Sequence, residues 1–452
     1  MSGSAADTVF ALASGSGRAA IAVLRISGPD SLPVLTALCG RPPPPRRAVV
    51  RTLRDAAGAA LDHAMVLWLP GPGSYTGEDS AELHLHAGRA VLGAVAGALA
   101  ALGLRPAEPG EFTRRAFLNG RLDLVAAEAV HDLVSAETEA QRRQALRQLE
   151  GALGGVYRGW SDRLRGDLAR QEALIDFPDE DLPPEVEAGL LASVRSLRIE
   201  IVSHLDDGQR GEKLREGLFF AITGAPNVGK SSLINALAER EVAIVSPTPG
   251  TTRDVIETRI VLGGVPVTLA DTAGLRDTVD PVEAEGVRRA HVRAASADLV
   301  IRVIEAGGGE TVPAVTGQTG TGQTGTAPLP PDALPPGALI VANKADLRPE
   351  TRPGVLPVSA LTGMGLDALR ARLAEAAHAL TETSGPPPLT RARHRVALQA
   401  ASRWLGEAGD AVEPELRGEA MRLALRALGT ITGQVGVEDI LDSIFRQFCI
   451  GK

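Results

Sequence analysis

The sequence predicts a protein of the α/β and all-α classes combined: an N-terminal α/β region, a helical region in two separated segments, and an α/β insert between those segments. Short strand-like runs and one helix fill about the first 120 residues, helical patterns cover 122–214 and resume from 390, and strands alternate with helices over 218–379. This alternation predicts a mainly parallel sheet with crossover helices. A chain of 452 residues has room for about three domains.

Composition excludes several classes of protein. With 44% hydrophobic and 23% charged residues, the chain is typical of globular proteins rather than disordered ones. It has no charge-free apolar run of about 18 residues and no basic and apolar leader, so we expect neither a membrane span nor a secretory signal. Two cysteines, Cys39 and Cys449, cannot build a disulfide framework. We therefore expect a cytoplasmic protein without a membrane partner. The net charge of −8 argues against a protein coated with nucleic acid but leaves room for a local basic patch.

The elements follow in order along the chain. Strands are expected at 20–26, 64–69 and 80–86, the last because it alternates polar and apolar residues, and a helix at 89–101. Residues 307–337 are rich in Gly, Thr and Pro and contain the pentamer Gly-Gln-Thr-Gly-Thr twice. Such a stretch buries too little apolar surface to order itself, so we predict a disordered loop there.

A phosphate-binding loop is the strongest motif. Gly224–Ser231 matches G-x-x-x-x-G-K-[ST], between a strand-like run at 218–223 and a helix-like run at 232–237. The loop amides and the helix N-terminus favour a phosphate chain. Lys230 is the cation for the β- and γ-phosphates, and the Ser231 hydroxyl is placed for Mg²⁺.

Three downstream motifs predict which nucleotide binds. Asp271–Gly274 ends a strand and puts a carboxylate near Mg²⁺. Asn343–Asp346 ends another strand, and its aspartate can accept both hydrogen bonds that guanine offers and adenine cannot. Ser359–Leu361 fits a backbone contact to the guanine oxygen. In this order the motifs resemble those of the translation-factor-related GTPases, so GTP is the predicted nucleotide. The predicted GTP-binding residues are Asn227, Val228, Gly229, Lys230, Ser231, Ser232, Ser246, Pro247, Thr248, Pro249, Gly250, Thr251, Thr252, Asp271, Thr272, Ala273, Gly274, Asn343, Lys344, Ala345, Asp346, Ser359, Ala360 and Leu361.

The distribution of two scarce residue types supports this site. The chain has only four lysines and four asparagines, as a coding bias towards arginine would produce. Two of the lysines, Lys230 and Lys344, and two of the asparagines, Asn227 and Asn343, fall inside the nucleotide motifs. Random scatter accounts poorly for that placement.

The hydrolytic machinery departs from that of Ras-like enzymes. These orient water with a glutamine directly after the Asp-x-x-Gly motif, where this chain has Leu275. Asn227 and the loop 247–254 instead resemble those of potassium-activated GTPases, in which a monovalent cation replaces an arginine finger worth about 10³–10⁵-fold in rate. In this interpretation Ser231 and Thr252 bind Mg²⁺. The residues predicted around K⁺ are Asn227, Ser246, Thr248 and Thr251.

The predicted catalytic residues of this domain are Asn227, Lys230, Arg276 and Glu283. A carboxylate such as Glu283 on a loop can position a second water or act as a general base. The alternative is that the acidic stretch around it is a solvated switch helix.

Blocks spread along the whole chain resemble the tRNA uridine-modification GTPases of the MnmE/TrmE type. They include Leu24–Gly28, Tyr75–Asp79, Pro109–Thr113, Arg115–Leu124 and Phe448–Lys452. The resemblance implies an N-terminal tetrahydrofolate-binding and dimerisation domain at 1–120, a discontinuous helical domain at 121–215 plus 385–452, and an inserted Ras-like P-loop GTPase domain at 216–384.

The resemblance also implies cofactors and partners. The family is a K⁺-activated homodimer that works in a heterotetramer with an FAD-dependent partner of the MnmG/GidA type, the FAD being on the partner only. Together they install a carboxymethylaminomethyl or aminomethyl group at carbon 5 of the wobble uridine of certain tRNAs. A 5-formyl or 5,10-methylene tetrahydrofolate is the implied one-carbon donor. Folate contacts carry over by position onto Arg25, Glu82, Arg121 and Lys452.

Some alternatives stay open at this point. Cys449 lies near the folate region in this resemblance, where it acts chemically or only fills space; prenylation is disfavoured because Lys452 is an unusual final residue for that signal. A ribosome-assembly or other switch GTPase without modification activity shares every nucleotide motif. A folate-dependent transferase with a vestigial GTPase is disfavoured by the intact Lys230, Asp271 and Asp346.

Overall fold

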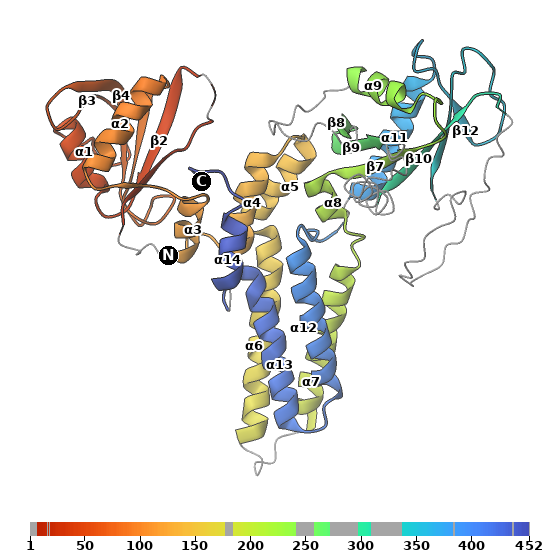
Figure 1. Cartoon of the computed structure of the whole chain (residues 1–452). Coiled ribbons are helices and arrows are strands. Elements are labelled where there is room, and N and C mark those ends of the chain that lie inside the picture. Colours follow the sequence, from red (N-terminus) through yellow and green to blue (C-terminus); the bar gives the residue numbers. More distant parts are fainter. Residues whose placement is uncertain are drawn as a thin grey trace, which may run out of the picture. The chain divides into compact units, whose positions relative to one another are not determined.

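A computed structural model of the chain describes residues 7–15, 17, 19–176, 184–240, 257–271, 297–308, 337–382, 385–435 and 438–451. The described residues fall into two compact units (Figure 1). The first draws on Met1–Val134, Leu146–Ile201 and Val396–Lys452, and the second on Ser135–Ala145 and Val202–Arg395. The three-domain boundaries given above stay a prediction, and the loop predicted at 307–337 lies outside the described residues except at its ends.

The first unit opens with a six-stranded sheet in the order β3-β4-β5-β2-β1-β6. Its strands are β1 Val9–Leu12, β2 Ile21–Ser27, β3 Val49–Arg54, β4 Ala60–Leu69, β5 Ser80–His86 and β6 Arg105–Pro106. All pairs are antiparallel except β1 with β6. The predicted strands at 20–26, 64–69 and 80–86 are confirmed, as is the helix at 89–101.

One face of this sheet carries the core, because successive strand residues point to opposite faces. Leu24 and Ile26 of β2 and Leu83 and Leu85 of β5 pack with helices α1 (Ser31–Cys39) and α2 (Arg89–Ala101). The intervening positions, Arg25, Glu82 and His84 among them, therefore lie on the other face. Two of the predicted folate contacts, Arg25 and Glu82, sit on that second face.

The rest of the first unit is helical, as predicted. Its helices include α3 Glu111–Leu118, α4 Leu124–Ser135, α6 Ala152–Asp176, α13 Pro414–Thr432 and α14 Glu438–Phe445, with most of α7 Pro184–Leu205 and α12 Ala392–Asp410. The long helices α6, α7, α12 and α13 pack lengthwise (Figure 1). Arg417 of α13 is only 4% exposed and donates to Glu187 of α7 at 2.7 Å, which ties two of these helices together.

The end of the chain returns to the beginning. Phe445 and Phe448 pack with Leu124 in a small apolar cluster. Gly451 has φ +98°, and a Cβ there would meet the carbonyl oxygen of Leu12 at the end of β1. Glycine is therefore required at this position both by backbone conformation and by space.

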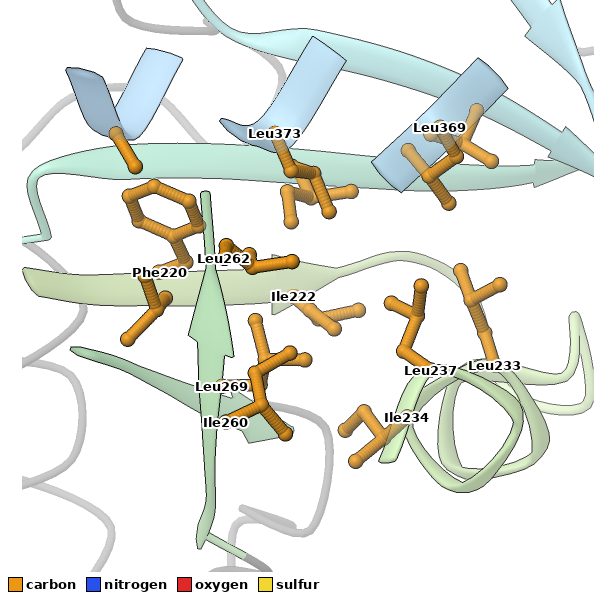
Figure 2. Packing of buried hydrophobic residues seen from close by; sticks show 14 of the residues in the cluster. Phe220, Ile222, Leu233, Ile234, Leu237, Ile260, Leu262, Leu269, Leu369 and Leu373 are labelled. Carbon is orange, nitrogen blue, oxygen red and sulfur yellow. The ribbon is translucent and has the colours of Figure 1, made fainter. Parts of the chain in front are cut away.

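The second unit is built on a six-stranded sheet in the order β12-β11-β10-β7-β9-β8. Its elements are β7 Leu218–Thr223, β8 Glu257–Leu262, β9 Val265–Asp271, β10 Leu299–Glu305, β11 Leu339–Asn343, β12 Val355–Pro357, α8 Arg210–Glu216, α9 Lys230–Arg240 and α11 Leu366–Thr381, and the unit includes most of α5 Glu139–Leu149. Among the described strands of this unit only β8 pairs antiparallel, so the predicted mainly parallel sheet is confirmed. Figure 2 shows its core, in which Phe220 and Ile222 of β7 pack with side chains of α9 and α11. Among the described residues, no helix is both long and apolar enough to span a bilayer.

Candidate functional site

The nucleotide motifs meet at one edge of the parallel sheet. The phosphate loop follows β7, Asp271 is the last residue of β9, and Asn343 is the last residue of β11. Ser359 comes two residues after β12. Because the carboxyl ends of parallel strands share an edge, these residues come together in space, which is where α/β sheets bind ligands.

The phosphate loop depends on two glycines. Gly224 and Gly229 have φ +149° and +91°, and a Cβ on either would collide with a neighbour: the carbonyl oxygen of Val303 in the first case and the side-chain amide of Asn343 in the second. Asn227 also has a positive φ, +65°, and is exposed at the turn of the loop. An asparagine tolerates this conformation better than most residues.

Two polar groups at the start of α9 face the loop and the sheet edge. Lys230 is 6% exposed, and its Nζ donates to the carbonyl oxygens of Gly224 and Ala225 at 3.0 and 2.9 Å. The Ser231 hydroxyl donates to Asp271 Oδ2 at 3.0 Å. A hydroxyl oxygen beside a carboxylate is a donor set that suits Mg²⁺, which takes oxygen ligands.

Asn343 braces the site. Its side chain is buried, with the residue 3% exposed. Its Nδ2 donates to the carbonyl oxygen of Val228 at 2.9 Å, and its Oδ1 accepts from the backbone N–H of Ala360 at 3.0 Å. One carboxamide thus holds the phosphate loop and the Ser359 loop to the end of β11. The sequence motif identifies Asn343 as a site residue, but it does not predict that the side chain bridges two loops.

The base end of the site is open. Asp346 is exposed, and Leu361 is 89% exposed. The two loops that carry these residues are held together at their buried ends. The N–H of Ala345 donates to the carbonyl oxygen of Val358 at 3.0 Å, and Ser359 is 1% exposed. Lys344, with φ +61°, lies 3.5 Å from Glu305 Oε2. Ser232 is exposed in the first turn of α9.

Several predicted site residues lie outside the described residues, so nothing is stated of their positions. They are Ser246, Pro247, Thr248, Pro249, Gly250, Thr251, Thr252, Thr272, Ala273, Gly274, Arg276, Glu283 and Lys452. In the part of the chain that the structure describes, no group of three or more His, Cys, Asp or Glu side chains is arranged to hold a metal ion.

On the polar face of the first sheet, Arg25 and Glu82 form a cross-strand pair. They are register partners on β2 and β5, and Glu82 Oε1 accepts from Arg25 Nε and Nη2 at 3.1 and 2.9 Å. The Arg25 guanidinium carbon lies 5.4 Å from the Tyr75 ring centroid and 5.7 Å from that of Phe112. These aromatic faces stabilise the cation and fix its orientation. Burial raises the pKa of Tyr75, so its hydroxyl stays protonated at neutral pH.

Arg121 reaches the same region through the loop after β4. A Cβ on Gly77 would lie 3.2 Å from Arg121 Cγ and 3.1 Å from Asn119 Cβ, so both side chains cover that glycine. Asn119 Nδ2 donates to the carbonyl oxygen of Thr76 at 2.7 Å. The loop after β4 therefore contacts Arg121 through Gly77 and Arg25 through Tyr75. The two predicted folate contacts thus lie against the same loop.

A buried ionic network on the same side of the sheet was missed by the sequence patterns. Arg115 of α3 pairs with Glu78 at 3.0 Å and with Glu111 at 2.9 Å, and Ser27 Oγ donates to Glu78 Oε2 at 2.8 Å. Burial alone would raise the pKa of Glu111, but hydrogen bonds from Arg105, the Glu108 N–H and Arg115 lower it below its usual value. The available signal was the i,i+4 spacing of Glu111 and Arg115.

Cys449 is exposed in the segment that follows α14. Its carbonyl oxygen accepts from the N–H of Gly110 at 3.4 Å, which holds this segment against the start of α3. Gly110 has φ +70°, and a Cβ there would lie 3.0 Å from Phe445 Cβ and 3.1 Å from Phe448 Cβ. The structure places Cys449 on the surface beside α3, and its chemical role stays a prediction.

Comparison with known proteins gives consistent matches over both units. Residues 8–121 match the family model of the GTP-binding protein TrmE N-terminus, and residues 124–449 match the MnmE helical domain. The tRNA modification GTPase MnmE of Gluconacetobacter diazotrophicus is 60% identical over 449 residues, 98% of each chain. The proteins of the same name from Granulibacter bethesdensis and Rhodospirillum rubrum are 55% and 54% identical, each over 99% of both chains. On these matches, and with the nucleotide motifs gathered at one sheet edge, the chain belongs to the MnmE/TrmE family of tRNA modification GTPases.

Proposed function

We propose that this chain is a K⁺-activated GTPase that acts with an FAD-dependent partner of the MnmG/GidA type. The pair installs a carboxymethylaminomethyl or aminomethyl group at carbon 5 of the wobble uridine of certain tRNAs and takes a one-carbon unit from a tetrahydrofolate. The observation that carries the GTPase half is the meeting of the phosphate loop, Asp271, Asn343 and Ser359 at one sheet edge. The relatives, which are named as tRNA modification GTPases, support the RNA half.

The chain's own residues account for nucleotide binding in steps. Lys230 already points its ammonium at the phosphate loop, so an incoming triphosphate takes the place of the two carbonyl oxygens that it contacts. Ser231 and Asp271 present adjacent oxygens for Mg²⁺, which when bound neutralises charge on the β- and γ-phosphates. Asp346 at the open end accepts hydrogen bonds from guanine. Asn343 keeps these ends in register.

The potassium half of the proposal is supported by Asn227. Its carboxamide is exposed on the phosphate loop, where an oxygen donor suits an alkali cation. K⁺ when bound supplies positive charge that an arginine finger supplies elsewhere. Ser246, Thr248 and Thr251 are the other proposed ligands, and Thr252 joins Ser231 at Mg²⁺. Glu283 is the proposed water-positioning carboxylate, and Arg276 a further candidate for charge stabilisation.

GTP turnover in KCl against NaCl at equal ionic strength tests this half. We expect a large preference for potassium. Asn227→Gly removes the carboxamide yet keeps the positive φ, so it should abolish the preference without unfolding the loop. The matched control is Asn235→Ala, which removes a carboxamide from the exposed side of α9. This variant should keep the preference for potassium. Equal rates in both salts for the unaltered protein would overturn potassium activation.

The folate half rests on the polar face of the first sheet. Arg25 is a fixed cation for the glutamate end or ring of a folate, and Glu82 is a carboxylate for its N–H groups. Arg121 and Lys452 are the remaining proposed contacts. Arg25→Gln should weaken binding of 5-formyltetrahydrofolate to the full chain at least tenfold, whereas Arg89→Gln, an exposed arginine on α2, should not. Unchanged binding in Arg25→Gln would contradict the assignment.

A switch GTPase without modification activity is the competing function. Mass spectrometry of wobble uridines in a strain lacking the gene separates the two. Loss of the modified uridine supports the proposal, and normal modification favours the switch. Co-purification with the FAD-dependent partner and the mass of the complex in solution test the proposed homodimer and heterotetramer.

A further inference from the structure

A stretch of the first unit concentrates positive charge in a chain that is acidic overall. We call residues 41–54 the arginine segment; it holds Arg41, Arg46, Arg47, Arg51 and Arg54. No aspartate or glutamate occurs between Asp30 and Asp55, although the whole chain carries 55 acidic residues and a net charge of −8. The segment is therefore a local departure from the charge balance of the protein.

The fold gathers these arginines at one edge of the sheet. The segment runs from the end of α1 through a proline-rich loop into β3, which is the edge strand beside β4 (Figure 1). Arg51 Nε donates to the carbonyl oxygen of Arg41 at 3.2 Å, which brings the two ends of the loop together. Arg41, Arg46, Arg47 and Arg54 are exposed.

The charges of the arginine segment are not neutralised within the described residues. None of the five arginines forms an ion pair with a carboxylate there, and the side-chain hydrogen bonds of Arg51 and Arg54 go to backbone carbonyl oxygens. A carbonyl oxygen leaves the positive charge of a guanidinium in place. By contrast, Arg105, Arg115 and Arg158 of the same unit each contact a carboxylate.

We propose that the arginine segment binds the phosphodiester backbone of the tRNA. This inference rests on the proposed function and deepens it, because it names the surface with which this chain holds the RNA. Guanidinium groups form paired hydrogen bonds with phosphate oxygens. Contacts to the backbone position an RNA without reading its sequence, so this surface sets affinity and salt dependence rather than the choice among tRNAs.

A triple variant of the full chain tests the proposal. Arg41→Gln, Arg47→Gln and Arg54→Gln together remove three exposed charges. Arg51 is kept because it holds the loop to β3, and Arg46 because its guanidinium lies against Gly73. The matched control is Arg142→Gln, Arg165→Gln and Arg422→Gln, which changes the net charge equally but at arginines that already contact carboxylates.

Fluorescence anisotropy with an unmodified tRNA transcript, over a series of salt concentrations, gives the readout. For the triple variant we expect at least about tenfold weaker binding at 150 mM salt and a slope of log affinity against log salt reduced by about 2. The control should keep the affinity and slope of the unaltered protein. GTP turnover and thermal denaturation of each variant report that the fold and the nucleotide site are intact.

The other outcomes each overturn the proposal. Equal loss in both variants would mean that net charge alone governs binding, and no loss in either would mean that the RNA lies elsewhere. Normal tRNA binding together with lost binding of the FAD-dependent partner would assign the arginine segment to an acidic protein surface. If the unaltered chain hydrolyses GTP but binds no tRNA at any salt, this inference fails while the GTPase assignment stands.

Discussion

The bracing position of Asn343 allows a quantitative prediction. Asn343→Ala removes two hydrogen bonds, at 2.9 and 3.0 Å, and leaves the Val228 carbonyl oxygen and the Ala360 N–H without this partner in a buried place. Each lost bond costs about 0.5–1.5 kcal/mol, and an unsatisfied buried group costs more. We take about 2–3 kcal/mol in all, which corresponds to about 30- to 150-fold in a binding constant.

This cost should appear in nucleotide affinity, because the phosphate loop and the Ser359 loop must be in register before the nucleotide contacts both ends. Titration of a fluorescent GDP analogue into the full chain measures it. Asn235→Ala makes the same chemical change at an exposed position of α9 and should leave the affinity within about twofold, as surface changes do. Asn343→Ala with an affinity within threefold of the unaltered protein would refute the idea that this carboxamide braces the site.

Three further changes have expected outcomes. Asp346→Asn should weaken GTP binding at least a hundredfold. The variant should favour xanthosine triphosphate instead, because the xanthine base presents an acceptor where guanine has an amine. Competition binding between the two nucleotides measures this change, and a retained preference for guanine would contradict the prediction. Glu111→Gln should lower the free energy of unfolding by about 2 kcal/mol at pH 7. Because interactions in the folded state lower the pKa of Glu111, its stabilisation is present above about pH 4.3, the ordinary value for a glutamate, and is lost as the pH falls below that. Denaturant curves of the variant and the unaltered protein should therefore converge at low pH. A difference in unfolding free energy that stays constant with pH would refute the prediction. Gly451→Ala should make the C-terminal segment sensitive to protease, whereas Gly120→Ala, with φ +67° and open space around its Cβ, should not.

Many of the helices and strands could be predicted from the sequence, because their local apolar patterns and stop residues agree with how the elements pack. The strand at 218–223 and the helix at 89–101 have the predicted bounds, since each is apolar and ends at a clear stop such as Gly224 or Gly103. β1 and β3 were missed: the first spans only four residues, and the second is an edge strand with arginines at two positions. Short or half-exposed strands lack a periodic pattern that is distinct from a loop.

The sequence predicted which residues belong to the candidate site, but not the contacts that hold them in place. Motif spacing identifies Lys230, Asp271 and Asn343 because the strands that precede them are regular and parallel. It does not reveal that Asn343 spans two loops, since that contact joins residues 115 positions apart. Nor does it place the Tyr75 ring over Arg25, because that contact depends on how the loop after β4 folds back onto β2.

The contact between Gly451 and Leu12 has a consequence for biosynthesis. The two residues are separated by about 440 positions, so the first strand emerges from the ribosome long before the residue that covers its end. Phe445 and Phe448 likewise arrive late to partners such as Leu124 that were made early. Packing of this kind waits for distant segments and is slow to form. The early-made β1 and α4 must therefore persist without their final cover during translation, and a nascent chain stalled before Phe445 should recruit chaperones to the uncovered apolar surface around Leu124.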